Sequence, residues 1–180
     1  MYKQKIVLAL SFLTLFFQGS IGHTIEPVQV TWESLIPPEM TREMVRKGTV
    51  LDEKIKFGMR YDLSFFPLVK ALNGKTIQIA GFALPLEFEG TLAKEFLLVP
   101  YVGACIHAPP PLPNQIIYVS SKNGFESKSL YTPVWVTGVM RTEVGDFNLD
   151  YVDGVEEVTV GYSMSGDQIK PINHTKPNNR

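Results

Sequence analysis

Alternating apolar and polar positions in the second half of the chain predict a β-rich fold. The longest alternation follows a turn signal at Asn73-Gly74 and predicts a strand over 76–86, with a bend at Gly81 and an end or bulge at Pro85. A connection is expected over 87–91. Further strands are predicted at 95–101, 115–120, 134–142 and within 158–172, with turns at 122–124 and 153–154.

The clearest helical pattern precedes these strands, over residues 38–47. Pro38 suits the first turn of a helix, and Gly48 suits the position just beyond its end. Met40 and Met44 are four residues apart, so they share one face that can pack on a core. We therefore expect a short N-terminal helix.

Several short strands after one helix favour a mainly β fold of the α+β kind. A small, mostly antiparallel β-barrel or sandwich accommodates them. A five-stranded barrel of the oligonucleotide/oligosaccharide-binding (OB) type fits the number of strands, and that name by itself implies no ligand.

The first residues have the pattern of a secretory signal peptide. Lys3 and Lys5 precede an apolar block over 6–17, and small residues suit cleavage after Gly22. The block is shorter than the about 20 apolar residues that a membrane-spanning helix needs. The expected organisation is a cleaved signal peptide over 1–22, a single globular domain over 23–172 and a polar tail over 173–180, in the periplasm.

Charge and motif content exclude several classes of function. The formal charge of −1 falls to −3 when the two leader lysines are removed, which disfavours nucleic-acid binding. The sequence has no Cys-x-x-Cys, Gly-x-Ser-x-Gly, phosphate loop, dinucleotide fingerprint or His-Glu-x-x-His. We therefore predict a protein that is not an enzyme and not an integral membrane protein.

The stretch over 95–115 carries the most distinctive chemistry. It contains the only cysteine, Cys105, followed two residues later by His107 and then by prolines 109–111 and 113. In an extended segment, side chains two apart share a face, so Cys105 and His107 can point the same way. That pair is a plausible two-ligand contribution to a zinc or copper site.

Further ligands would have to come from other segments. Glu87 is the first candidate, because the strand that ends there is expected to neighbour the 95–101 strand. Glu89, on the same connection, and His174, in the tail, are alternatives. The competing interpretation is that Cys105 is a small buried hydrophobic residue and that the His107 ring is hydrogen-bonded by backbone groups or by Asn114 and Gln115.

Two other interpretations of the stretch remain open. Cys105 activated by His107 is a possible catalytic thiol, although no third group is evident to orient the imidazole. The proline run favours a polyproline II conformation and offers a docking surface for a partner protein, with Tyr101 and Tyr118 as contributors.

Three segments together resemble a known family. They are Gly81-Phe-Ala-Leu-Pro-Leu-Glu87, the 95–115 stretch with its Gly-Ala-Cys-Ile-His-x-Pro-Pro-Pro element, and Pro133-Val-Trp-Val-Thr-Gly138. They are similar to the DUF3299 family of exported bacterial proteins, over roughly 73–140. Leu112 stands where the family pattern has another proline, which alters the loop rather than Cys105 or His107.

The resemblance implies an accessory role beside a periplasmic transport system. It suggests that the chain handles a divalent metal, with zinc first, and that its partners are components of an ABC-type membrane transporter. The alternative is a metal-free adaptor that docks a transporter or another protein through the proline-rich loop. A cysteine-dependent enzyme is the third hypothesis.

Overall fold

The fold is described from a computed structural model of the chain. The described residues are 26–38, 40, 66–103, 111–127, 129–151 and 154–172, with the backbone alone at 87–88, 150–151 and 154–156. The predicted signal peptide, most of the predicted helix over 38–47 and the predicted polar tail lie outside these residues.

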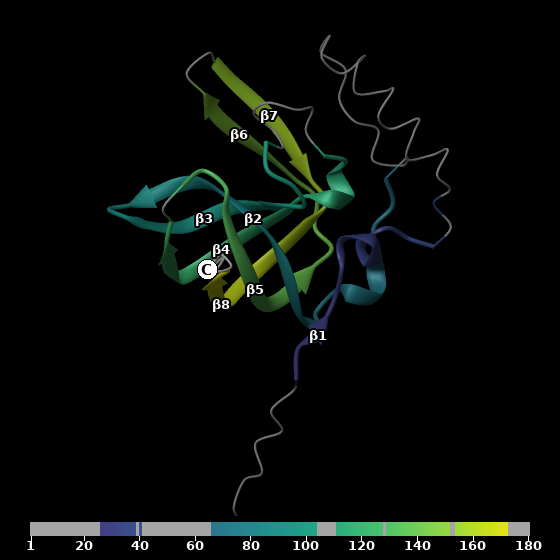
Figure 1. The fold of residues 1–180 in the computed structure, drawn as a ribbon. Coiled ribbons are helices and arrows are strands. Elements are labelled where there is room, and N and C mark those ends of the chain that lie inside the picture. Colours follow the sequence, from purple (N-terminus) through teal and green to yellow (C-terminus); the bar gives the residue numbers. More distant parts are fainter. Residues whose placement is uncertain are drawn as a thin grey trace, which may run out of the picture.

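Five strands form a closed barrel (Figure 1). They are β2 (Thr76–Glu89), β3 (Leu92–Val99), β4 (Ile117–Glu126), β5 (Thr132–Arg141) and β8 (Tyr162–Pro171). Around the barrel the order is β2-β3-β4-β8-β5, and β5 pairs again with β2. The pairing of β4 with β8 is parallel, and the other four barrel pairings are antiparallel. In chain order this is the 1-2-3-5-4 arrangement of an OB barrel, so the predicted fold class is confirmed.

A second, smaller sheet is the antiparallel hairpin of β6 (Gly145–Tyr151) and β7 (Gly154–Val160), which extends away from the barrel in Figure 1. The short strand β1 (Val28–Gln29) lies parallel to the start of β2. Within the described ranges the helical elements are three short 3-10 turns: η1 (Trp32–Leu35), η3 (Lys70–Leu72) and η4 (Pro113–Gln115). None of the helices in that part of the chain is long and apolar enough to cross a bilayer.

Strand β2 is shared between two neighbours because it bends, as the sequence predicts. Its residues 76–83 pair with β5, and residues 82–89 pair with β3. At the bend, a Cβ on Gly81 would lie 2.9 Å from the Val99 carbonyl oxygen and 2.9 Å from a Trp32 ring carbon. Glycine is therefore needed there for close packing, and the bulge after Pro85 is also confirmed.

Two predicted boundaries are wrong. β2 continues through Glu87 to Glu89, so the expected connection over 87–91 reduces to the turn at Gly90, whose φ is +66°. The predicted turn at 122–124 is instead a bulge inside β4. Between Glu95↔Ser120 and Ala93↔Phe125, β4 has four residues where β3 has one. Gly124 permits this with φ +60°, and β4 resumes its pairing after it.

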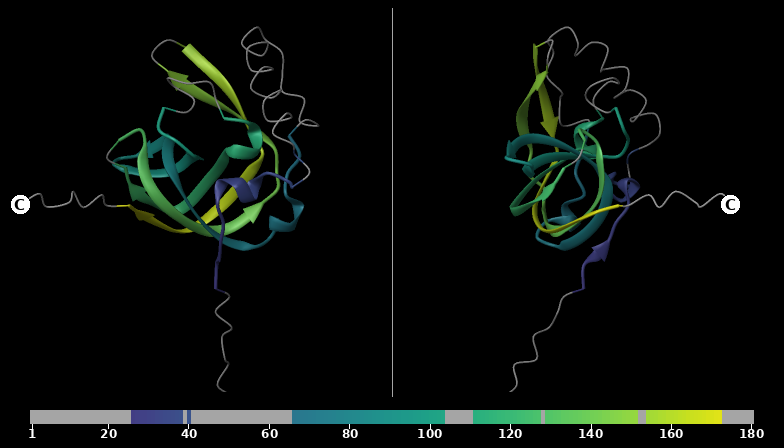
Figure 2. Two further views of the ribbon diagram at one scale, coloured as in Figure 1. Left: turned by 45° about the vertical axis from the view of Figure 1, so that its right-hand side comes forward. Right: turned by 60° about the vertical axis from the view of Figure 1, so that its left-hand side comes forward.

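The barrel interior is filled by one face of each strand. Strand β5 alternates buried and half-buried positions along almost its whole length, as a sheet with one face in a core requires. Phe96 and Phe125 meet edge to face inside, with ring centroids 5.3 Å apart. Leu35 and Leu72, from the segments that precede the barrel, join the same cluster. Figure 2 shows these segments lying against the barrel.

A second hydrophobic cluster lies on the outer face of the barrel. Leu84, Leu97 and Ile116 point outward and are covered by Leu149 and Val158 of the β6–β7 hairpin. The hairpin therefore protects from water a part of the barrel wall that is apolar on both faces, which explains why residues 96–99 form one continuous buried run.

The hydroxyl of Tyr162 ties the preceding segments to the barrel. Tyr162 is fully buried at the start of β8. Its hydroxyl donates to the Leu35 carbonyl oxygen at 2.9 Å and accepts from the Val69 amide at 2.7 Å. One side chain thus satisfies two backbone groups from segments that lie about 90 or more residues away in sequence.

We predict that Tyr162→Phe lowers the free energy of unfolding by about 2 kcal/mol, because it leaves the Leu35 carbonyl and the Val69 amide without this partner. Urea denaturation measures the change. Ser163→Ala is the matched control on β8, because its hydroxyl makes only an exposed contact of 3.3 Å with Glu143. Equal stabilities for the two variants would contradict the assigned role of Tyr162.

Candidate functional site

The predicted ligands Cys105 and His107 lie outside the described residues, within the segment 104–110. The structure describes the residues on either side of that segment, up to 103 and from 111. β3 ends at Val99, and the chain re-enters the described structure at residue 111, before η4 and β4. Because Leu98 pairs with Ile117, the Cys-x-His segment connects two adjacent antiparallel strands at one end of the barrel.

The returning end of this connection is firmly held. The Gly161 amide donates to the Pro113 carbonyl oxygen at 2.7 Å, and a Cβ on Gly161 would lie only 2.8 Å from the same oxygen. The Gln115 side-chain amide donates to the Trp32 carbonyl oxygen at 3.0 Å. Trp32 in turn donates from its ring nitrogen to the Ala80 carbonyl at 2.8 Å. The start of β8 and the η1 segment, itself bonded to β2, therefore fix the place at which the connection returns.

Asn114 is a buried polar residue at this end. Its side chain is fully buried, and its Nδ2 lies 3.3 Å from the Met40 sulfur and 3.4 Å from the Pro67 carbonyl oxygen. Its Oδ1 has no hydrogen-bond partner among the described residues. A buried amide oxygen without a hydrogen-bond partner is energetically costly. The Oδ1 of Asn114 is therefore available to accept a hydrogen bond from a group outside the described residues.

Glu87 lies beside the middle of β3, away from the end at which the Cys-x-His connection leaves. It pairs with Glu95, whereas Val99 pairs with Phe82. Five residues of strand separate Glu87 from Phe82, about 16 Å at the usual rise. The predicted adjacency of the two strands is confirmed, and ligation by Glu87 stays a prediction that requires the connection to run back along β3. The alternative Glu89 forms an ion pair with Lys94.

Within the described ranges, no group of three or more His, Cys, Asp or Glu side chains converges as a metal site would. Directly before the undescribed segment, Tyr101 and Val102 expose 43% and 60% of their surface. Tyr118, predicted to contribute to the same docking surface, is half-buried and stacks on Phe147 of the hairpin, with ring centroids 4.3 Å apart. Its contribution to docking stays a prediction.

Tyr118 and Glu95 form a polar contact on the outer face of the barrel. Partial burial of the phenol raises the pKa of Tyr118 to about 12, together with a hydrogen bond to the Glu95 carboxylate and repulsion between that carboxylate and the phenolate. Tyr118 is therefore a neutral donor to Glu95 throughout the ordinary pH range, and it helps to fix where the Glu95 side chain lies.

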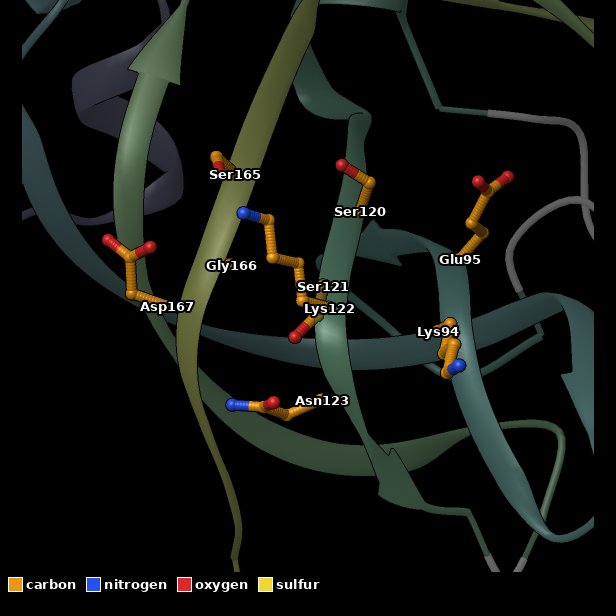
Figure 3. A pocket seen from close by; sticks show the side chains of 9 residues that line it. All are labelled: Lys94, Glu95, Ser120, Ser121, Lys122, Asn123, Ser165, Gly166 and Asp167. Atoms are coloured by element: carbon orange, nitrogen blue, oxygen red, sulfur yellow. The ribbon is translucent and has the colours of Figure 1, made fainter.

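Sequence reasoning did not find a polar groove of about 480 Å³ beside this contact. It opens where β3, β4 and β8 diverge, beyond the last β4–β8 pair, Ser120↔Ser165 (Figure 3). Its lining consists of Lys94, Glu95, Ser120, Ser121, Lys122, Asn123, Ser165, Gly166 and Asp167. These residues come from three strands and form no motif along the chain, so only the turn signal at 122–124 pointed to this region.

A closed, mixed five-stranded barrel with an inserted hairpin defines the chain as a small OB-type β-barrel protein. The comparisons with known proteins give its family. The model of the family described as "Protein of unknown function (DUF3299)" matches residues 32–171, and the chain belongs to that family.

A solved structure supports both the family and the fold. The chain is similar to the crystal structure of a DUF3299 family protein (PA4066) from Pseudomonas aeruginosa PAO1, with 31% sequence identity and a TM-score of 0.56. The match covers 83% of this chain and 98% of that one. No curated protein matches the chain significantly. The family match extends the resemblance seen in the sequence to nearly the whole predicted domain.

We predict that Tyr118 makes stability fall at alkaline pH. Because its pKa is raised in the folded state, its contribution is complete below about pH 10 and is lost as the pH rises towards about 12. Denaturation at several pH values should show a steeper loss for the wild type than for Tyr118→Phe. Glu95→Gln removes the carboxylate and should lower the pKa of Tyr118 in a tyrosinate absorbance titration. Identical profiles for all three proteins would exclude the Tyr118–Glu95 coupling.

Proposed function

We propose that this protein is an exported, non-enzymatic binding protein that takes up a divalent metal ion, zinc first, through Cys105 and His107. The observation that carries the proposal is the anchoring of the Cys-x-His connection. It leaves β3 and returns to β4 at adjacent positions, and its returning end is held by η4. A connection fixed at both ends has a reduced loss of chain entropy when it closes around an ion.

The chemistry of the two side chains fits a borderline metal. A thiolate and a neutral imidazole are common zinc ligands, and binding requires both to be deprotonated. The remaining positions of the site are filled by water, by a further side chain or by a partner protein. A ligating histidine usually donates its second ring nitrogen to an acceptor, and the unpartnered Oδ1 of Asn114 lies seven residues beyond His107 in sequence.

The leader pattern and the resemblance seen in the sequence support the proposed setting. The chain would be carried across the inner membrane by its signal peptide and would act in the periplasm beside the membrane components of an ABC-type transporter. An open-ended site with two protein ligands suits an accessory protein that passes its ion to a partner, because such a site releases metal more readily than a closed four-ligand site.

We predict that the mature chain, from residue 23, binds close to one equivalent of zinc when it is purified reduced and without a metal-binding tag. Cys105→Ser and His107→Ala should each remove most of the bound zinc under competition with a chelator, because each deletes one of two protein ligands. Metal content is measured by elemental analysis and folding by circular dichroism.

Glu87→Gln is the informative third variant. Zinc loss in this variant would place Glu87 in the coordination sphere and would require the connection to run back along β3. Retained zinc would leave the third position to another group. A well-folded wild-type protein that binds neither zinc nor copper would overturn the proposed metal function.

The second candidate is a metal-free adaptor, and the exposed pair Tyr101 and Val102 favours it. Two neighbouring large side chains that are 43% and 60% exposed, directly before a proline-rich segment, are typical of a docking surface. In this case, Tyr101→Ala and Val102→Ser would weaken capture of a transporter component, whereas chelation would leave that capture unchanged.

A further inference from the structure

The groove between β3, β4 and β8 is a second place where this chain can bind a ligand. It lies at the far end of the β4–β8 ladder from Tyr162, since that ladder runs from Ile117↔Tyr162 to Ser120↔Ser165. The Cys-x-His connection joins β4 at the Tyr162 end. The groove and the proposed metal site are therefore separate, and each can be tested without the other.

Two bulges shape the groove. On one side, residues 121–124 of β4 bulge out opposite Lys94. On the other side, Asp167 is the extra residue of a bulge between β8 and β5, because Gly138 pairs with Gly166 and Thr137 with Gln168. Bulges of this kind redirect side chains and are frequent beside binding sites. They also break the regular strand edge that an added peptide strand would need, so the groove is better suited to a small molecule.

Gly138 shows that the second bulge is a fixed feature. A Cβ on Gly138 would lie 2.0 Å from the Ser165 carbonyl oxygen, which is far closer than any side chain can approach. The backbones of β5 and β8 therefore touch at this point. That contact sets the path of β8 at Ser165 and Gly166, along one wall of the groove.

Two of the four charged side chains in the lining have partners. Lys94 forms an ion pair with Glu89, and Glu95 accepts the hydrogen bond of Tyr118. Both side chains are thereby held on the β3 side of the groove. The charge of Lys94 is balanced by Glu89, and Glu95 keeps its negative charge but is engaged by Tyr118, so neither is the group that a ligand would meet first.

The other two charges, Lys122 and Asp167, make no side-chain hydrogen bond or ion pair in the described part of the chain. In Figure 3 the Lys122 side chain extends from β4 towards Ser165 and Gly166 on β8. A Cβ on Gly166 would lie 3.0 Å from a Val119 methyl carbon, so glycine lets β8 pack closely against β4 there. The lining thus offers one free ammonium, one free carboxylate and a set of neutral hydrogen-bonding groups from Ser120, Ser121, Asn123 and Ser165.

The lining also excludes the ligands usual for an OB barrel. No aromatic side chain lines the groove, so it has no stacking surface for a base. Its two lysines are balanced by two carboxylates, so it does not attract a polyanion. A ligand that satisfies the lining needs a negative group for Lys122, a positive group for Asp167 and a polar body between them.

We propose that this groove binds a small zwitterion of the amino-acid or dipeptide class. The ligand carboxylate contacts Lys122, and its ammonium contacts Asp167. The serine hydroxyls and the Asn123 amide hydrogen-bond the backbone of the ligand. The volume of about 480 Å³ is within the usual range for small-molecule sites.

The test uses three forms of one ligand: alanyl-alanine, its N-acetyl derivative, which lacks the ammonium, and its C-terminal amide, which lacks the carboxylate. Calorimetry on the mature chain should detect the parent dipeptide and about tenfold weaker binding of each derivative, since each loses one charged hydrogen bond. Lys122→Met should weaken binding of the parent and the acetylated form and leave the amide unchanged. Asp167→Asn should weaken binding of the parent and the amide and leave the acetylated form unchanged.

Lys170→Met is the matched control, because Lys170 is an exposed lysine of β8 that does not line the groove. It should bind all three forms as the wild type does, and so should Cys105→Ser. No binding of alanyl-alanine by a folded wild type would overturn the proposal. Binding that neither Lys122→Met nor Asp167→Asn alters would also overturn it, and so would tighter binding of a single-stranded oligonucleotide in the same groove.

Discussion

One buried hydroxyl holds together the parts of this structure that are far apart in sequence. Tyr162 begins the last barrel strand and contacts the backbone of both preceding segments, at Leu35 and Val69. Those segments lie against the barrel. The backbone carbonyl of Trp32, in the first of them, accepts a hydrogen bond from the Gln115 side chain and so helps to fix η4. The position of the Cys-x-His connection therefore depends on contacts that are not part of it.

The barrel separates two kinds of polar chemistry. At one end, the Cys105–His107 segment joins β3 to β4 next to a buried Asn114. At the other end, two bulges open the wall between β4 and β8 into a groove with balanced charge. Between the two ends, the barrel wall at residues 96–99 is buried and apolar on both its inner and its outer face. A rigid wall of this kind allows each end to change its surface residues without disturbing the other.

The sequence predicted features that depend on local pattern and missed those that depend on long-range pairing. The alternation of β5, the bend at Gly81 and the bulge after Pro85 were all readable, because each follows from side-chain period or from glycine and proline. The turn at 122–124 was wrong because the same residues serve equally as a bulge when β3 supplies a partner beyond them. Cys105 and His107 stood out as a motif, whereas Lys122 and Asp167 come to line one groove only after the barrel closes.

The placement of β8 has a consequence for how the chain reaches its folded state. β8 pairs with both β4 and β5. Its pairing with β4 begins at Ile117↔Tyr162, two residues that β5 and the inserted β6–β7 hairpin separate in sequence. Until residues 162–171 are available, the barrel has two open strand edges, and such edges invite association between chains. A fold dominated by distant pairings also forms slowly. Closure therefore waits for the last strand of the barrel, and a chain that lacks residues 162–171 keeps both edges open.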